Sequence, residues 1–227
     1  MNDKEVSRIF KRYGNLPITN ALLAVIKNHD DEKLLEHVMY AIEENARRLL
    51  ELVTHGHKVT DILHKFYEAN EEITDYPPST IQCRKGCAFC CHINVTISQA
   101  EAELIQEYCN EHGMKIDWQR FKDQRKLTEQ THASSEYKKC AFLKDNQCSV
   151  YEVRPFNCRN YFVITPAFLC DADKFPKGTV GTYVNVEKEV LHSAFILMLN
   201  KLGLPYEQDS MARTFLNLKK IKDNEKQ

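Results

Sequence analysis

Residues 83–92 read CRKGCAFCCH and contain four cysteines, two of them adjacent. A second group follows, with seven residues between Cys140 and Cys148 and nine between Cys148 and Cys158. Thiolates are soft ligands that select zinc, copper(I) or iron–sulfur clusters. Cysteines with two or three residues between them let a tight loop surround one metal centre. Gly86 permits the backbone reversal that such a loop needs. The pattern therefore predicts a segment that is held together by metal rather than by an apolar core alone.

All nine cysteines lie between residues 83 and 170, and eight of them are candidate metal ligands. These eight are Cys83, Cys87, Cys90, Cys91, Cys140, Cys148, Cys158 and Cys170. The ninth, Cys109, shares the apolar face of a predicted helix with Leu104 and Ile105, so we expect it in the core. The alternative, that the clustered cysteines are inert core residues as well, is disfavoured by their density.

The adjacent pair Cys90–Cys91 leaves the number of centres open. Neighbouring side chains of an extended chain point to opposite sides. The two thiols therefore serve different centres, or one of them is a spare or redox-active thiol. Eight thiolates make two four-sulfur sites, or one such site with reactive cysteines beside it. His92, which follows the pair, is a further candidate ligand, with a capping or solvent-exposed role as the alternative.

Composition narrows the classes of function. The 227 residues carry 31 Lys and Arg against 32 Asp and Glu, a formal net charge of −1. This balance disfavours broad electrostatic binding of nucleic acid or of an anionic membrane, and no apolar run is long enough to span a bilayer. The first residues lack the apolar stretch of a secretory signal. We therefore expect a cytoplasmic protein with reduced thiols, and neither nucleic acid nor membrane as a partner.

The chain on both sides of the cysteines is predicted to be helical. Apolar residues recur every three or four positions from Leu34 to Val53 and predict one apolar face of a long helix, which ends before Gly56. A second amphipathic helix is predicted to begin at Val59. Two such helices with a short loop between them should pack as an antiparallel hairpin. The predicted helices lie near residues 3–13, 18–28, 30–53, 59–67, 98–112, 117–127, 186–202 and 210–221.

The cysteine-rich region shows local signals of its own. Ser98 and Glu101 form a capping box at the start of a helix, and residues 140–151 are typical of a short hairpin with a cysteine on each arm. Two consecutive prolines after Tyr76 mark a boundary. The predicted division is a helical region at 1–76, a metal-binding domain at 77–172 and C-terminal helices at 173–227 that pack on the rest. The predicted fold class is mainly α, a helical bundle with a small, irregular, cysteine-rich segment.

Residues 148–159 read CSVYEVRPFNCR. With the cysteines at 83–91, this stretch resembles the YkgJ-type cysteine-cluster family, described as a zinc- or iron-chelating domain and related to a domain of flagellin lysine-N-methylases. The resemblance covers about residues 83–161 and implies that the eight cysteines are cluster ligands, Cys170 being the least well matched. Tyr151, Arg154 and Arg159 match other positions of the family. We expect the arginines to donate hydrogen bonds around the site, and Tyr151 to pack over the cluster or in the core.

These observations predict a metal-binding protein that holds zinc or a 4Fe–4S cluster, with its helices available to a protein partner. The alternative is a cluster-dependent enzyme, methyltransferase-like by analogy with the flagellin methylases. A metal carrier is a third possibility. Cys83, Cys87 and Cys90 also have the spacing of a radical-SAM cluster loop, but the chain after them is too short and too helical for that barrel.

Overall fold

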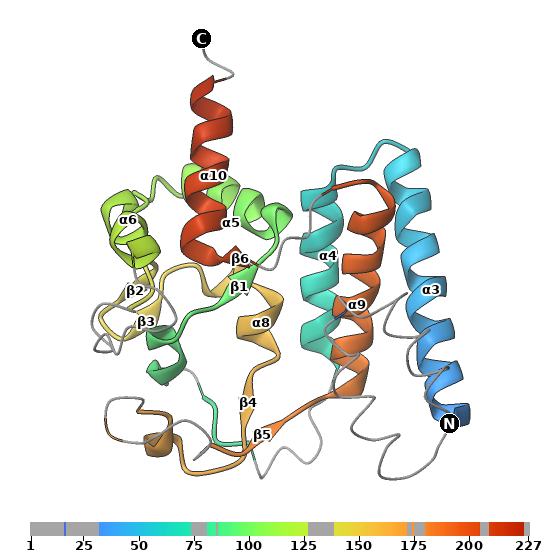
Figure 1. The fold of residues 1–227 in the computed structure, drawn as a ribbon, viewed down its shortest axis with the longest axis horizontal. Helices are drawn as coiled ribbons and strands as arrows, with labels where there is room; N and C mark the ends of the chain where they lie inside the picture. Colours follow the sequence, from blue (N-terminus) through green and yellow to red (C-terminus); the bar gives the residue numbers. More distant parts are fainter. Residues whose placement is uncertain are drawn as a thin grey trace. The chain divides into compact units, whose positions relative to one another are not determined.

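The computed structural model describes residues 16, 32–73, 81–84, 86–126, 139–171, 174, 180–204 and 209–224. It is mainly helical, as the sequence predicts, and divides into two compact units (Figure 1). The first consists of Met1–Ile73 and Val184–Tyr206, and the second of Thr74–Tyr183 and Glu207–Gln227. The helices predicted near 3–13 and 18–28, and the domain boundaries after 76 and 172, lie outside the described residues. None of the described helices is long and apolar enough to cross a membrane.

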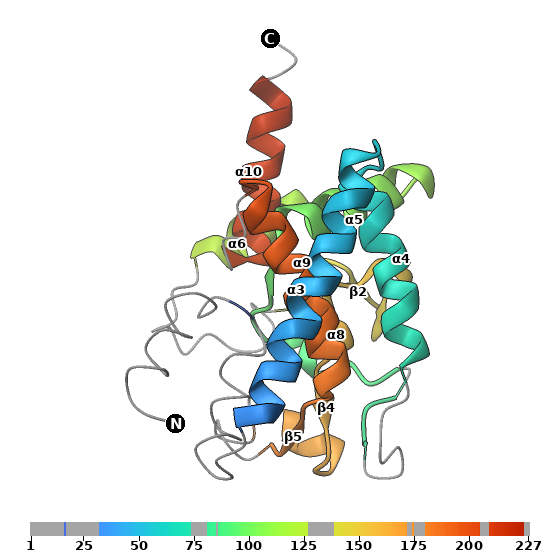
Figure 2. The same ribbon diagram turned by 90° about the vertical axis from the view of Figure 1, so that its right-hand side faces the viewer.

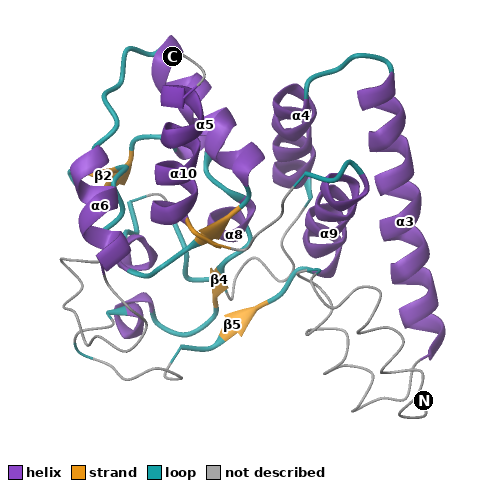
Figure 3. Cartoon of the chain, turned by 45° about the horizontal axis from the view of Figure 1, so that its top comes forward, coloured by secondary structure: helices purple, strands orange, loops and turns teal. Residues whose placement is uncertain are grey.

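The first unit is a three-helix bundle in its described part. Its helices are α3 (Glu32–Thr54), α4 (Val59–Glu72) and α9 (Val186–Lys201), and α9 lies between the other two (Figures 1 and 3). The predicted periodicity is confirmed, because the buried residues of α3 lie three or four positions apart. The bundle core includes Val38, Ile42, Ala46, Leu49, Ile62, Leu63, Tyr67, Phe195, Met198 and Leu199.

The turn between α3 and α4 follows from Gly56. This residue has a φ of +87°, a conformation that side chains with a Cβ rarely adopt. Its N–H donates to the Val53 carbonyl at 2.9 Å, and the His57 N–H donates to the Leu52 carbonyl at 3.2 Å. These two bonds form a Schellman motif, which satisfies the last carbonyls of α3 and reverses the chain into the predicted hairpin.

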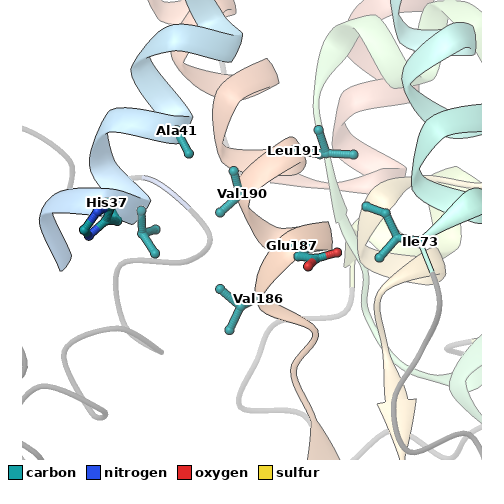
Figure 4. Close-up of a pocket in the computed structure, with 8 residues that line it drawn as sticks. His37, Ala41, Ile73, Val186, Glu187, Val190 and Leu191 are labelled. Carbon is teal, nitrogen blue, oxygen red and sulfur yellow. The ribbon is translucent and has the colours of Figure 1, made fainter. Parts of the chain in front are cut away.

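An open apolar hollow lies on the first unit, between α3 and the start of α9 (Figure 4). Its lining consists of His37, Val38, Ala41, Ile73, Val186, Glu187, Val190 and Leu191. Val186 is 44% exposed, so this part of the bundle presents apolar surface among the described residues. A protein partner for the helices stays a prediction from the sequence.

The helical part of the second unit packs around a cluster of aromatic rings. Helix α10 (Met211–Asn224) lies against α5 (Gln99–Glu111) and α6 (Trp118–Lys126) (Figures 1 and 2). Phe215 of α10 stacks on Phe121 of α6 with ring centroids 4.7 Å apart, and Phe142 lies 5.4 Å from Phe215. Phe121 and Phe215 are fully buried. This cluster forms part of the apolar core of the second unit.

The cysteine-bearing part of the second unit is built from very short elements. Among the described residues, its sheets are three antiparallel pairs of two-residue strands. The elements are η2 (Phe89–His92), β1 (Thr96–Ile97) with β6 (Asp209–Ser210), β2 (Leu143–Lys144) with β3 (Gln147–Cys148), η3 (Tyr151–Val153), α8 (Phe156–Arg159), β4 (Phe162–Val163) with β5 (Thr182–Tyr183), and η4 (Ala167–Cys170).

The predicted hairpin is present between β2 and β3. Asp145 and Asn146 occupy its two-residue loop with φ of 49° and 58°. Asn and Asp tolerate positive φ at both central positions of a type I′ turn, whose twist matches that of the flanking strands. The hairpin therefore brings Cys140, just before β2, close to Cys148 at the end of β3.

The two C-terminal helices belong to different units. Helix α9 packs with α3 and α4, whereas α10 packs with α5 and α6. Both lie in the segment that the sequence analysis treats as one region after residue 172. The predicted domain limits stay predictions. The packing assigns α9 and α10 to different units, because each helix packs against different helices.

Candidate metal centre

Cys83 is held against strand β4. The Val163 N–H donates to Cys83 Sγ at 3.3 Å, and the Cys83 thiol donates to the Tyr161 carbonyl at 3.7 Å. The Gln82 N–H continues the ladder with a 2.7 Å bond to the Val163 carbonyl. Strand β4 directly follows α8, which carries Cys158. These contacts join the start of the first cysteine group to the end of the second.

The Cys90–Cys91 pair lies in the 3-10 turn η2 and not in an extended segment, so that expectation is wrong. The Cys91 N–H donates to the Ala88 carbonyl at 3.0 Å, which closes the turn. A 3-10 helix has three residues per turn, so neighbouring side chains diverge by about 120°.

The two cysteine groups are also joined directly through the backbone. The Cys140 N–H donates to the Cys91 carbonyl at 2.7 Å, and the Leu143 N–H donates to the Cys140 carbonyl at 3.1 Å. Leu143 pairs with Cys148 in the hairpin. Residues about fifty positions apart in the sequence are therefore neighbours.

Helix α8, which carries Cys158, is anchored by Glu101. One oxygen of this buried carboxylate accepts from the Phe156 N–H at 2.8 Å. The other accepts from the Ser98 N–H at 2.7 Å and from the Ser98 hydroxyl at 3.0 Å. The predicted capping box is present. The bond to Phe156 could not be predicted from the sequence, because a contact between residues 55 positions apart leaves no signal in a local motif.

Arg154 and Arg159, which belong to the stretch at residues 148–159, lie close to Cys158 in the sequence. Arg159 is buried, and its Nε donates to the Arg154 carbonyl at 2.7 Å while its terminal nitrogen donates to the Glu152 carbonyl. The Arg154 guanidinium lies 3.8 Å from the ring centroid of Tyr151. Tyr151 is 46% exposed, so the interpretation as a core tyrosine is wrong. The positive charges of Arg154 and Arg159 oppose the rise in the pKa of the Cys148 thiol that burial causes.

One set of thiols lies around β4 and η4, and we call it the β4 group: Cys83, Cys87 and Cys170. Turns η2 and η4 are in contact. Burial raises the pKa of the Cys170 thiol, and the charges of Cys87, Cys83 and Cys90 raise it further. Burial also raises the pKa of the Cys83 thiol, which the Val163 N–H opposes.

A second set lies around the hairpin and α8, and we call it the hairpin group: Cys140, Cys148 and Cys158. Burial raises the pKa of the Cys140 thiol to about 11. The Cys158 thiol has its pKa raised well above the usual value by burial and then by the charges of Cys140, Cys90 and Cys148. For Cys90 the hydrogen bond with Cys91 is the largest cause of a raised pKa, followed by burial.

Residues 82–177 match the family model CxxCxxCC, whose description is "putative zinc- or iron-chelating domain". The segment is similar to this family, and we call it the CxxCxxCC domain after the model. The match begins one residue before Cys83 and continues past Cys170, so the CxxCxxCC domain contains all eight candidate ligands. The predicted resemblance to a zinc- or iron-chelating cysteine-cluster family is confirmed. No curated protein and no solved structure matches the chain.

The donor set of the CxxCxxCC domain fits a soft metal, because it consists of clustered thiols that come from three stretches of the chain. Among the described residues, no three side chains of His, Cys, Asp or Glu lie close enough together to hold a metal ion. Burial and mutual repulsion favour the protonated thiols, so metal binding must release protons. Cys109 lies outside both groups and is 1% exposed on α5, as the sequence predicts.

Proposed function

We propose that the CxxCxxCC domain binds zinc or an iron–sulfur cluster through its eight clustered cysteines, and that the bound metal stabilises the fold of the second unit. One observation carries this proposal. The Cys140 N–H donates to the Cys91 carbonyl, so the start of the hairpin lies beside the Cys90–Cys91 turn although the two are far apart in the sequence.

The role of the metal follows from the secondary structure around it. The strands of this part have two residues each, and its helical turns have three or four. Elements this short form few backbone hydrogen bonds of their own. A metal–thiolate centre would supply cross-links between them, as it does in small zinc domains. The aromatic core around Phe215 stabilises the neighbouring helices instead.

Individual residues of the chain support such a centre. The Val163 N–H faces the sulfur of Cys83, where it stabilises a thiolate. Arg154 supplies positive charge near Cys90 and Cys148, which offsets part of the negative charge of several thiolates. Arg159 holds the backbone before Cys158 in place through two main-chain carbonyls.

The test is metal analysis with an absorption spectrum, on protein purified without oxygen. Zinc without colour, or iron with acid-labile sulfide and absorption near 400 nm, supports the proposal. A chelator should then lower the melting temperature of the wild-type chain. The control is Cys109→Ala, which removes a cysteine of the core and should keep all of the metal. Folded protein without stoichiometric zinc or iron would refute the proposal. The enzymatic alternative rests on the family resemblance alone.

A further inference from the structure

We propose that helix α10 controls access to the thiols of Cys140, Cys148 and Cys158, because it holds in place the hairpin and the short helix that carry them. While α10 is docked, these three thiols are half-buried. Release of α10 loosens the elements around them and exposes them to a soft metal ion or to its donor. This inference rests on the proposed function, because it concerns how access to the same site is regulated.

Helix α10 is docked on the second unit by noncovalent contacts. The chain that precedes it, Val184–Tyr206, belongs to the first unit, so α10 returns to the second unit as a separate piece. Its side chain Phe215 is fully buried in the aromatic core. A helix that is held by packing and a few hydrogen bonds opens locally at a lower cost in free energy than the unfolding of the whole unit.

The first connection from α10 to the thiols runs through Phe142. This residue lies between Cys140 and strand β2, and its ring centroid is 5.4 Å from that of Phe215 on α10. The Phe142 carbonyl accepts from both the N–H and the hydroxyl of Ser149, each at 2.9 Å, and Ser149 directly follows Cys148. Phe142 therefore ties the two arms of the hairpin to the aromatic core, and release of α10 removes one of its packing partners.

The second connection runs through strand β1, which contacts both α8 and α10 (Figure 1). Strand β1 pairs with β6 directly before α10, and the Met211 N–H donates to the Val95 carbonyl at 2.8 Å. Asn157, the residue before Cys158, donates from Nδ2 to the Thr96 carbonyl at 2.7 Å and to the Thr96 hydroxyl oxygen at 3.1 Å. Packed side chains and hydrogen bonds of this kind couple distant positions. The position of Cys158 therefore depends on the docking of α10.

The test first loosens α10 and measures the thiols, in the reduced, metal-free chain. Phe215→Leu keeps an apolar side chain but removes the ring contacts. N-ethylmaleimide, followed at each cysteine by peptide mass spectrometry, should react about fivefold faster or more with the three thiols. Cys170 belongs to neither connection, and its rate should change by less than about twofold. The matched control is Lys220→Ala, at an exposed position of α10, which should leave all rates unchanged.

The reverse experiment cuts the connection at β1 and measures α10. Asn157→Ala removes both hydrogen bonds to β1, and the Met211 N–H should then exchange with deuterium about fivefold to tenfold faster, as measured by NMR. The fluorescence of Trp118, the single tryptophan, should shift as well, because its ring lies 6.3 Å from that of Phe215. The control is Asn110→Ala, the same substitution at an exposed position of α5, which should change neither readout.

Unchanged thiol rates in Phe215→Leu, or unchanged Met211 exchange in Asn157→Ala, would overturn this inference. An equal rise at all nine cysteines would overturn it too, because that result indicates global unfolding and not release of α10. If circular dichroism shows that Phe215→Leu does not fold, the Asn157→Ala experiment decides alone. These measurements use the metal-free chain, so their failure leaves the proposed function intact. Wild-type protein that holds no metal when purified without oxygen would instead overturn the proposed function.

Discussion

Replacing Glu101 with Gln should destabilise both α5 and the helix that carries Cys158. The Glu101 carboxylate is 2% exposed and accepts at least three hydrogen bonds, from the N–H and hydroxyl of Ser98 and from the N–H of Phe156. A Gln side chain has a single oxygen acceptor. Its amide NH₂ group must therefore face either the Ser98 N–H or the Phe156 N–H, and that backbone donor is left buried without an acceptor.

The magnitude follows from the bonds that change. Hydrogen bonds to a charged group contribute about 1.5–3 kcal/mol each, and a buried unsatisfied donor costs about 1–3 kcal/mol. Removing the buried charge recovers part of this, because a carboxylate is costly to desolvate. We expect Glu101→Gln to lower the free energy of unfolding of the metal-free chain by about 2–3 kcal/mol.

Urea unfolding, followed by circular dichroism and extrapolated to water, measures this difference. The matched control is Glu107→Gln, an exposed position on the same helix, which should change the free energy by less than about 0.5 kcal/mol. Metal binding provides a second readout, since Cys158 lies two residues after Phe156. If Glu101→Gln is as stable as the control and binds metal with unchanged affinity, the anchoring role of Glu101 is wrong.

Three further predictions concern the core, the thiols and the hairpin. Phe215→Ala should lower the free energy of unfolding in urea by about 3–5 kcal/mol, because the ring is fully buried and stacks on Phe121; a loss below 1 kcal/mol would contradict this packing. The pKa of Cys140 is raised to about 11 in the folded chain, so its contribution to the stability of the metal-free fold should be intact below pH 9 and fall by up to about 3 kcal/mol as the pH rises to 11. Cys140→Ala should remove that part of the pH dependence in the same assay, and an unchanged profile would refute the assignment. Asn146→Ala should lower the melting temperature, at a cost of up to about 1–2 kcal/mol, because alanine lacks the short polar side chain that lets asparagine tolerate the left-handed conformation, whereas Asn146→Gly should not; equal melting temperatures would argue against the positive φ.

Local features of the fold were predictable from neighbouring residues. The capping box at Ser98, the helix end at Gly56 and the hairpin around Asn146 each depend on contacts within a few positions. The amphipathic periodicity of α3 predicts its buried face in the same way. The thiol spacing likewise indicated a metal-chelating domain, which the family match confirms.

Other features could not be predicted, because they depend on contacts between distant parts of the chain. The position of the Cys90–Cys91 pair is one example, since the Cys91 carbonyl accepts a hydrogen bond from the Cys140 N–H at 2.7 Å. Tyr151 is another, because its exposure depends on how η3 packs and not on its own sequence neighbourhood. The eight ligands and the domain limits stay predictions, which the metal analyses above address.

The sequence by itself determined the class of the protein and its chemistry: mainly helical, with a thiol-rich segment suited to zinc or iron. These properties follow from residue type, spacing and periodicity, which act over a few positions. The tertiary structure alone decided that α9 packs with α3 and α4, and that Glu101 anchors α8. The physical reason is that these contacts join residues 50 or more positions apart, and their partners are selected by packing and burial of the whole chain.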